Sequence, residues 1–397
     1  MVRFSDRVAA LKPTAVNAIL AEVRELQGQG RTFVSLMRGE PDLPTPPHIA
    51  AAATQALHDG RTGYPDNRGE PKLREAVAAK LARDNGLTYD TKSEILVTTG
   101  ATLGIFVALA ALLNEGDEVL VPDPIYDAYL SPIRLAGGVP CPVPARIDSQ
   151  RFILDPDALE AAWTPACRVL LLNTPWNPVG AVLRKTELEA VADFCLRRNL
   201  TLLSDEIYET ILYEGARHLS PAALSPEIRE RTILINSLSK TYAMTGWRCG
   251  YCAAPRELID KMFLVLQQSS RGPATFVQDA AAAALAGPQD AVAAMTAEYA
   301  RRRTHVTTHL DGAGGCPVLA PEGGFFAMAD VRPLGFASNE VRRRLLHDAG
   351  VVVAHGAAYG TQGEGFLRVS FASGGDTLAR GLELLRQGLQ NLARANA

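Results

Sequence analysis

ILINSLSKTYAMTGWRCGY, residues 233–251, is the stretch that decides the fold and points to the chemistry. Its first residues, Ile233–Ile235, form an apolar run typical of a buried strand, and the polar turn Ser237–Lys240 follows. Arg248 comes eight residues after the lysine. Hydroxyls and a guanidinium suit a phosphate, and a partly buried lysine amine can lose its proton and act as a nucleophile. A phosphate beside such an amine is the chemistry of a pyridoxal phosphate (PLP) Schiff base, although a lone surface lysine beside a turn is the commoner situation.

The whole stretch resembles the lysine-site signature of the class I and II aminotransferases, which are fold type I PLP enzymes of the aspartate aminotransferase superfamily. That signature reads Ser-x-Ser-Lys-x-x-x-Met-x-Gly-Trp-Arg-x-Gly-Tyr, and residues 237–251 meet every fixed position. The resemblance implies that Lys240 carries PLP as a Schiff base and acts in catalysis. It also implies that Ser237, Ser239 and Arg248 bind the cofactor.

The composition is that of an ordinary soluble protein. The 397 residues are 47% hydrophobic and 21% charged, and the length allows two domains with sizeable cores. A formal net charge of −3 without a long charge run does not favour nucleic-acid binding. The amino-terminal residues lack the apolar core of a secretory signal, and the longest apolar run, 101–113, is too short for a bilayer span. We expect a cytoplasmic protein that binds neither nucleic acid nor membranes.

Six cysteines fit a reducing compartment. Cys249 and Cys252 form a single C-x-x-C, but no second pair or histidine cluster stands near them, so we expect no metal site. If residues 248–253 form a strand, these two side chains point to opposite faces, which argues against a redox pair. We expect both thiols to serve packing.

Short apolar runs alternate with helical patterns between residues 95 and 253, which is typical of an α/β domain with a mostly parallel sheet covered on both faces. The candidate strands are 95–98, 118–121, 168–172, 200–204, 232–235 and 248–253. Ligands of such sheets bind beyond the carboxyl ends of the strands, and the polar motifs do follow these strands. The resemblance implies a sheet of the seven-stranded kind.

The last part of the chain predicts a smaller α+β domain. Phe325–Ala329, Val351–Ala354 and Phe366–Phe371 read as strands, and a closing helix repeats leucine on one face between 378 and 392. An arm and one helix at the amino terminus should join this domain. The predicted divisions are 1–48 for the arm and helix, 49–285 for the large PLP-binding domain and 286–397 for the small C-terminal domain.

Two further motifs are ambiguous when taken singly. Thr99–Leu103 opens a helix with small residues, and the free amino terminus of a helix is a ready phosphate site. Tyr126 stands in a proline-rich turn, where packing is the usual role. The resemblance implies that the amides of Ala101 and Thr102, with the Thr102 hydroxyl, bind the PLP phosphate. It implies that the ring of Tyr126 stacks on the pyridine ring.

The loop Asn173–Gly180 meets the family form Asn-x-Pro-x-Asn-Pro-x-Gly in full, which implies that Asn177 donates to the phenolic oxygen of PLP and lies beside the substrate. Asp205 and Glu206 end a predicted strand. Two carboxylates there could belong to a metal site, but the other ligands that a metal needs are missing from the pattern. The resemblance implies that Asp205 keeps the pyridine nitrogen protonated, that Tyr208 binds the phenolic oxygen, and that Glu206 is structural.

Arg368 lies at the centre of the apolar run Leu367–Ala372, where a charge is costly unless it is paired. An internal ion pair would satisfy it. The resemblance implies instead that Arg368 clamps the α-carboxylate of the substrate. It also implies that Gly39, in the proline-rich loop 38–47, offers a backbone amide to the same carboxylate.

Tyr64, Gly69, Leu73 and Arg74 match a family pattern whose tyrosine reaches the cofactor phosphate of the partner subunit. This implies a homodimer with shared active sites, in which Tyr64 is a cofactor-binding residue. Arg271 could face an acidic substrate, although a solvated arginine is the simpler interpretation.

Together these motifs predict an aminotransferase that exchanges the amino group of an L-amino acid with a 2-oxo acid by a ping-pong mechanism. Some close relatives that act on acidic substrates have a lysine where this chain has Thr102, which favours a neutral or aromatic substrate here. Other PLP chemistry stays open: C–S lysis, elimination or replacement, or a biosynthetic cyclisation. A PLP-binding transcription regulator is a remote alternative, because the pattern leaves no room for a DNA-binding domain before the arm.

Overall fold

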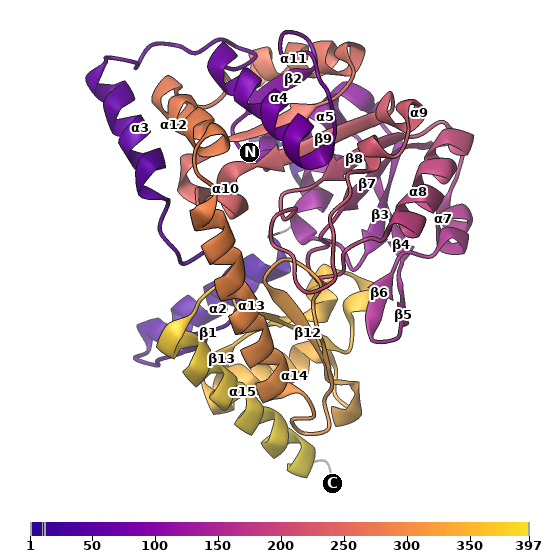
Figure 1. Cartoon of the computed structure of the whole chain (residues 1–397). Coiled ribbons are helices and arrows are strands. Elements are labelled where there is room, and N and C mark those ends of the chain that lie inside the picture. The colour runs from indigo at the N-terminus through magenta and orange to yellow at the C-terminus, as the bar shows by residue number, and fades with distance from the viewer. Residues whose placement is uncertain (1, 10, 12, 396–397) are drawn as a thin grey trace.

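The computed structural model describes residues 2–9, 11 and 13–395. A seven-stranded sheet with its helices forms one lobe, in the upper part of Figure 1, and a four-stranded sheet forms a second lobe below it. The order across the large sheet is β2 (Ile95–Thr98), β10 (Gly250–Ala253), β9 (Thr232–Ser237), β8 (Thr201–Asp205), β7 (Cys167–Asn173), β3 (Glu118–Asp123) and β4 (Val139–Pro144). All neighbouring strands are parallel except β10, which is antiparallel to both of its neighbours.

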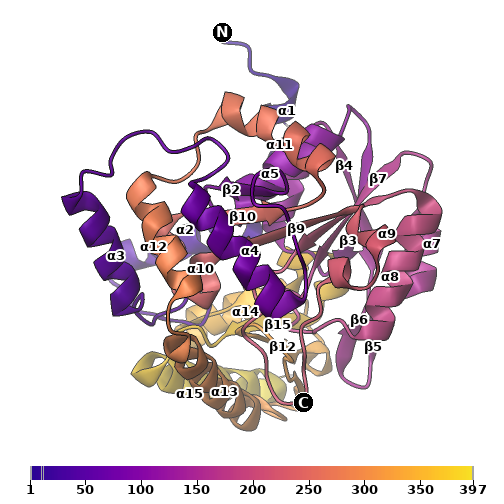
Figure 2. The ribbon, with the colours of Figure 1, turned by 45° about the horizontal axis from the view of Figure 1, so that its top comes forward.

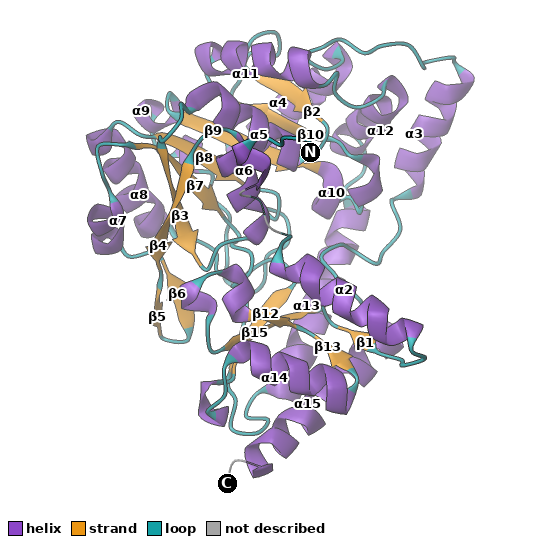
Figure 3. Ribbon diagram, turned by 180° about the vertical axis from the view of Figure 1, so that it is seen from behind, coloured by secondary structure: helices purple, strands orange, loops and turns teal. Residues whose placement is uncertain are grey.

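Helices cover both faces of this sheet, which explains why its strands are apolar throughout. One face carries α5 (Ala101–Leu112), α6 (Leu130–Leu135) and α11 (Arg256–Ser269), seen from behind in Figure 3. Figure 2 brings forward the opposite face with α3 (Pro47–His58), α4 (Pro71–Asn85), α7 (Pro156–Ala162), α8 (Lys185–Arg198), α9 (Pro226–Arg229) and α12 (Thr275–Ala286). The hairpin β5 (Arg146–Asp148) and β6 (Arg151–Ile153) extends from this lobe.

The second lobe is built on the sheet β11 (Val318–Leu319), β12 (Phe326–Asp330), β15 (Phe366–Ser370) and β14 (Ala354–His355), given in spatial order. Its helices are α13 (Asp290–Leu310), α14 (Ser338–Arg344) and α15 (Gly375–Ala395). The amino-terminal helix α2 (Ala15–Gly28) packs here, and β1 (Val34–Ser35) pairs in parallel with β13 (Val351–Val352). A short helix, α1 (Asp6–Ala9), precedes α2. The predicted boundaries at residues 48 and 285 stay predictions.

Each of the six strand runs predicted for the large lobe corresponds to a strand of its sheet. Across both lobes there are two corrections to strand bounds and one strand missed. Arg248 does not begin β10, because its left-handed backbone (φ 54°) does not fit a strand. Residues 351–354 are not one strand: β13 and β14 belong to two different sheets. The edge strand β4, Val139–Pro144, was not predicted because its three prolines speak against a strand, although prolines are tolerated at a sheet edge.

The two cysteines of the C-x-x-C motif are buried packing residues, as expected. All six cysteines are unpaired, and Cys249 and Cys252 lie in separate hydrophobic clusters on opposite faces of the sheet. Among the described residues, no helix has both the length and the apolar character to cross a bilayer.

A buried ion pair joins α4 to the segment after β8. Lys80 donates to Glu209, and their side chains are only 5% and 7% exposed. Glu209 also accepts from Asn85 at 2.9 Å and from Asn236 at 2.6 Å. Removing one partner of such a pair leaves a charge without compensation inside the protein.

We expect Lys80→Met to lower the free energy of unfolding by about 3–5 kcal/mol, because Glu209 would stay buried without its counter-ion. Urea unfolding of the cofactor-free protein at one fixed concentration measures this. The control is Lys185→Met, which breaks the exposed pair with Glu189 and should cost below about 1 kcal/mol. Equal effects of the two substitutions would contradict the prediction, and Lys80→Met/Glu209→Gln should recover part of the loss.

Candidate active site

Three polar side chains stand at the carboxyl ends of adjacent parallel strands. Asn173 ends β7, Asp205 ends β8 and Ser237 ends β9, and Asn173 and Asp205 are direct partners in the ladder. They line a cavity of about 650 Å³ whose other walls come from α2, the loop at 38–40, the start of α5, and β12 and β15 of the second lobe. The cavity therefore lies between the two lobes, at the place where α/β sheets bind ligands.

An anion cradle forms one end of this cavity. Ala101 and Thr102 form the amino terminus of α5, whose backbone amides are free to bind. The Arg248 guanidinium lies against the preceding turn, because a Cβ placed on Gly100 would meet Arg248 Nη2 at 2.5 Å. Ser237, which ends β9, and Ser239, in the short helix α10 (Leu238–Thr241), close the cradle. Helix amides, hydroxyls and a guanidinium together suit a phosphate.

Lys240 stands between the cradle and the second lobe. Its Nζ donates to the Gly39 carbonyl at 2.6 Å, and burial lowers the pKa of its amine to about 8, with Glu40 opposing and Arg248 adding to the shift. Near neutral pH a far larger fraction of this amine is unprotonated and nucleophilic than of an ordinary lysine, although the charged form still predominates.

Asp205 is buried opposite Lys240. Tyr129, in the short 3₁₀ helix η1 (Asp127–Tyr129), donates to its Oδ2 at 2.6 Å, and the Ile207 amide donates to Oδ1 at 3.2 Å. Burial raises the pKa of Asp205 to about 6, although both hydrogen bonds oppose that shift. A basic ring nitrogen placed against this carboxylate would be held protonated, because the ion pair relieves the cost of burial.

Asn177 and Arg368 approach each other across the lobe boundary. Arg368 NH1 donates to Asn177 Oδ1 at 3.2 Å, and the guanidinium stacks on the rings of Phe326 and Tyr359. Arg368 Nε is buried without a hydrogen-bond partner, and among the described residues no carboxylate forms an ion pair with this guanidinium. The internal ion pair considered from the sequence is therefore absent there, and Arg368 is free to bind a carboxylate that enters the cavity.

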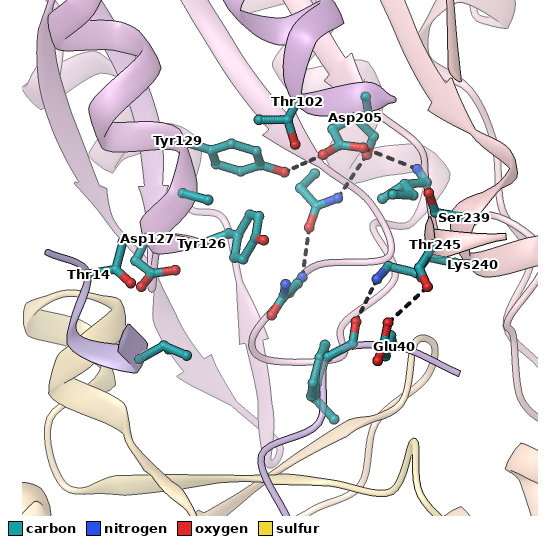
Figure 4. Close-up of a pocket in the computed structure, with 18 of the residues that line it drawn as sticks. Thr14, Glu40, Thr102, Tyr126, Asp127, Tyr129, Asp205, Ser239, Lys240 and Thr245 are labelled. Carbon is teal, nitrogen blue, oxygen red and sulfur yellow. Dashed lines mark hydrogen bonds between the residues drawn. The ribbon is translucent and has the colours of Figure 1, made fainter. Parts of the chain in front are cut away.

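Two tyrosines add aromatic walls. Tyr126 lines the cavity beside Asp205 and Tyr129, with ring centroids of the two tyrosines 5.2 Å apart (Figure 4). Tyr208 is buried and packs edge-on against Phe325 and Phe326. The structure thus places both tyrosines in one cavity with Lys240, and their predicted contacts with a cofactor stay predictions.

The loop at residues 38–47 ties the two lobes together beside the amine. Ser370 of β15 donates to the Arg38 carbonyl, and the Thr45 hydroxyl donates to the Ala243 carbonyl at 2.8 Å. The Thr245 hydroxyl donates to Glu40 between these two points at 2.9 Å. Gly39 presents its carbonyl to Lys240, so the predicted contact of its amide with a substrate stays a prediction.

Three residues from the sequence analysis lie elsewhere. Tyr64 is 82% exposed and does not line the cavity of its own chain, and Arg271 lies over its ring at 4.5 Å. Glu206 faces away from the cavity and accepts hydrogen bonds from Ser204, Ser220 and His218, so the structural role expected for it fits.

Glu206, Glu209 and His218 do bring three ligand-type atoms within 4.8 Å of one another. The oxygens of both carboxylates already accept hydrogen bonds from amine, amide, hydroxyl or imidazole groups. This donor set stabilises a buried network and does not resemble the open oxygen ligands of a metal site.

Among the polar cavity residues that sequence reasoning missed are Tyr129 and Asp127. Tyr129 contacts Asp205 because η1 lies over the end of β8. The two residues are 76 positions apart, so no local sequence pattern could predict the contact. Asp127 follows Tyr126 directly, and its position beside a candidate stacking ring was the one signal available.

Comparison with known proteins agrees with this geometry. The family model "Aminotransferase class I and II" matches residues 31–382. The chain is 39% identical over 388 residues to the aromatic-amino-acid aminotransferase 2 of Thermococcus litoralis, covering 97% of this chain and 98% of that protein. It is 40% identical over 383 residues to the aspartate/prephenate aminotransferase of Thermus thermophilus, covering 96% and 97%.

A solved structure of an aromatic aminotransferase from Pyrococcus horikoshii superposes with a TM-score of 0.88 at 40% identity, covering 92% of this chain and 96% of that one. The family match spans most of the chain, and the lysine, the anion cradle and the buried carboxylate all meet in one cavity. The chain therefore belongs to the class I and II aminotransferases, the fold type I transaminases that use pyridoxal phosphate.

Proposed function

We propose that this aminotransferase moves the amino group of a neutral or aromatic L-amino acid to a 2-oxo acid, and that Lys240 is its catalytic residue. The observation that carries the proposal is the amine of Lys240, with its lowered pKa, between an anion cradle and the buried Asp205. In the overall exchange the donor receives the oxo oxygen, and the acceptor receives the amino group and a hydrogen.

The residues present fit PLP. The α5 amides at Ala101 and Thr102, with Ser237, Ser239 and Arg248, would hold the phosphate. Tyr126 would face the ring, Asp205 its nitrogen, and Asn177 and Tyr208 its phenolic oxygen. A Cβ on Gly250 would meet the backbone of Gly100 and Ala101 at 2.9 Å. The glycine at 250 therefore lets β10 pack closely against the turn that opens α5. When bound, PLP supplies an electron sink for charge that develops at the substrate Cα.

The chain's own groups then perform three tasks. Arg368 binds the substrate α-carboxylate through donors that no carboxylate of the described chain occupies. Lys240 Nζ, as the free base, takes the proton from Cα and returns it as the acid. Asn177 fixes the orientation of Arg368 through their hydrogen bond, so the carboxylate and the amine hold the same substrate at two points.

The substrate class follows from the cradle and stays a proposal. Thr102 stands where some relatives that act on acidic substrates carry a lysine, so this chain lacks that cation. The similar proteins are named for aromatic and for aspartate/prephenate substrates, and these names favour neither class alone. We therefore infer the neutral or aromatic preference from Thr102.

We further propose a homodimer in a reducing, cytoplasmic compartment. Six unpaired cysteines support the compartment. Support for the dimer is the exposure of Tyr64, a large aromatic ring held under Arg271 outside its own cavity. In this proposal Tyr64 contacts the cofactor phosphate bound by the partner subunit.

Lys240→Ala should reduce transamination by at least about 10³-fold, because among the described residues no other lysine lines the cavity to carry the Cα proton. Product analysis with a panel of amino acids, 2-oxoglutarate and pyruvate measures this. The wild type should form a new amino acid only when an oxo acid is present. Ammonia released without an oxo acid would point to a lyase, and near-normal rates in the variant would remove Lys240 from the mechanism.

Incorporation of PLP into the cofactor-free protein should speed up as the pH rises through about 8, the pKa of Lys240, and level off about one pH unit higher. The lowered pKa of Lys240 means that its nucleophilic free base predominates above that pH. Stopped-flow absorbance gives the rate constants. Pyridoxamine phosphate lacks the aldehyde and serves as the control without this dependence. Rates that still climb steadily beyond pH 9.5 would show an unperturbed amine.

Mixing Lys240→Ala with Tyr64→Ala protein should restore activity after subunit exchange. If Tyr64 serves the partner's site, each hybrid dimer has one intact site, giving about a quarter of wild-type activity from an equal mixture. Each variant incubated alone is the control. A mixture no more active than its components would place Tyr64 at its own chain's site or outside the mechanism.

A further inference from the structure

An acidic side chain lies in the active-site cavity without a task in the proposed mechanism. Asp127 begins the 3₁₀ helix η1, directly after Tyr126, and lines the cavity. Its Oδ2 is buried and has no hydrogen-bond partner. A buried carboxylate oxygen without a hydrogen-bond donor costs free energy, and a donor on a bound substrate would remove that cost.

Asp127 belongs to the wall that a substrate side chain would meet. Figure 4 shows it beside Thr14, on the far side of Tyr126 from Lys240. The cavity lining also includes Val16, Asn17 and Leu20 of α2, the helix that Thr14 caps. A substrate held by its α-carboxylate at Arg368 and by its Cα at Lys240 would direct its side chain to this remaining wall. This part of the lining mixes the apolar Val16 and Leu20 with the polar Thr14, Asn17 and Asp127, and Asp127 is its carboxylate.

Among the described residues, no cation of the cavity forms a direct ion pair with Asp127. Arg248 lies at the α5 terminus, and Arg38 interacts with Glu40 at 3.4 Å and with the Pro41 carbonyl. Arg368 lies near enough to influence Asp127, but its partner is Asn177. Burial raises the pKa of Asp127, while the charge of Arg368 and the Thr14 hydroxyl lower it.

We propose that Asp127 is a specificity-determining residue, which rejects substrates whose side chain ends in a carboxylate and accepts a hydrogen bond from side chains that end in a donor. The inference rests on the proposed function and deepens its substrate class. A second carboxylate beside Asp127 would meet a like charge in a partly desolvated cavity. A phenol or indole N–H would satisfy the free Oδ2 while its apolar body packs on Val16 and Leu20.

A structural role for Asp127 has a different signature. The Thr14 hydroxyl caps α2 by accepting from the Asn17 amide at 3.3 Å, so Asp127 could act only by holding that cap in place. Thr14→Val removes the hydroxyl and keeps the Asp127 charge. It therefore separates a role in anchoring α2 from a role in charge recognition.

The test uses the PLP-loaded enzyme in half-reactions, with one amino acid and no oxo acid, followed by cofactor absorbance. For Asp127→Asn we expect the kcat/KM ratio of aspartate to phenylalanine to rise by at least about tenfold. For Asp127→Leu we expect the preference for tyrosine over phenylalanine to fall by several fold. Asp193→Asn, an exposed acid on α8 paired with Arg197, controls for the change in net charge.

Binding of unreactive analogues gives a readout that does not depend on turnover. Titration calorimetry with succinate should show binding to Asp127→Asn at least about tenfold tighter than to the wild type. Binding of 3-phenylpropionate should be nearly unchanged by the same substitution.

Unchanged ratios and unchanged succinate affinity in Asp127→Asn would overturn the inference, as would the same shifts produced by Thr14→Val. In either case the half-reaction with phenylalanine would still proceed, and the proposed function would stand. A wild-type enzyme that gives no half-reaction with any amino acid would instead contradict the proposed function.

Discussion

The parallel hydrogen-bond register between β7, β8 and β9 is the constraint on which the active site depends. It fixes Asn173 beside Asp205 and brings Ser237 to the same edge of the sheet. Side chains alternate along a strand, so Asp205 faces the cavity and Glu206 turns to the network with Ser220 on the other side. A slip of one residue would exchange these two carboxylates, and burial on both faces makes such a slip costly.

Burial acts on both ionisable partners in the cavity and moves their proton affinities toward each other. It lowers the pKa of Lys240 to about 8 and raises the pKa of Asp205 to about 6. Both shifts have one cause, because a charged form of either sign loses hydration inside the protein. Burial in the cavity therefore reduces the difference between the pKa values of Lys240 and Asp205. Such values suit groups that hold or exchange protons near neutral pH.

The fold class, six of the seven strands of the large sheet and the residues at the strand ends could be predicted from the sequence, because short apolar runs and sequence motifs are local. Features set by distant contacts could not. The split of 351–354 between two sheets depends on pairing with β1 and β15, and the role of Tyr129 depends on where η1 settles. The prediction that β10 begins at Arg248 was wrong. The backbone of Arg248 is left-handed, and its guanidinium lies against Gly100 at the start of α5.

The loop at residues 38–47 has a mechanical consequence. It is fastened to β15 through the Arg38 carbonyl and to the large lobe through Thr45, and Gly39 holds the reactive amine between these anchors. A rotation of one lobe against the other would pull on that short span before it disturbed either core. The loop therefore couples the spacing of the two lobes to the direction in which the Lys240 amine points.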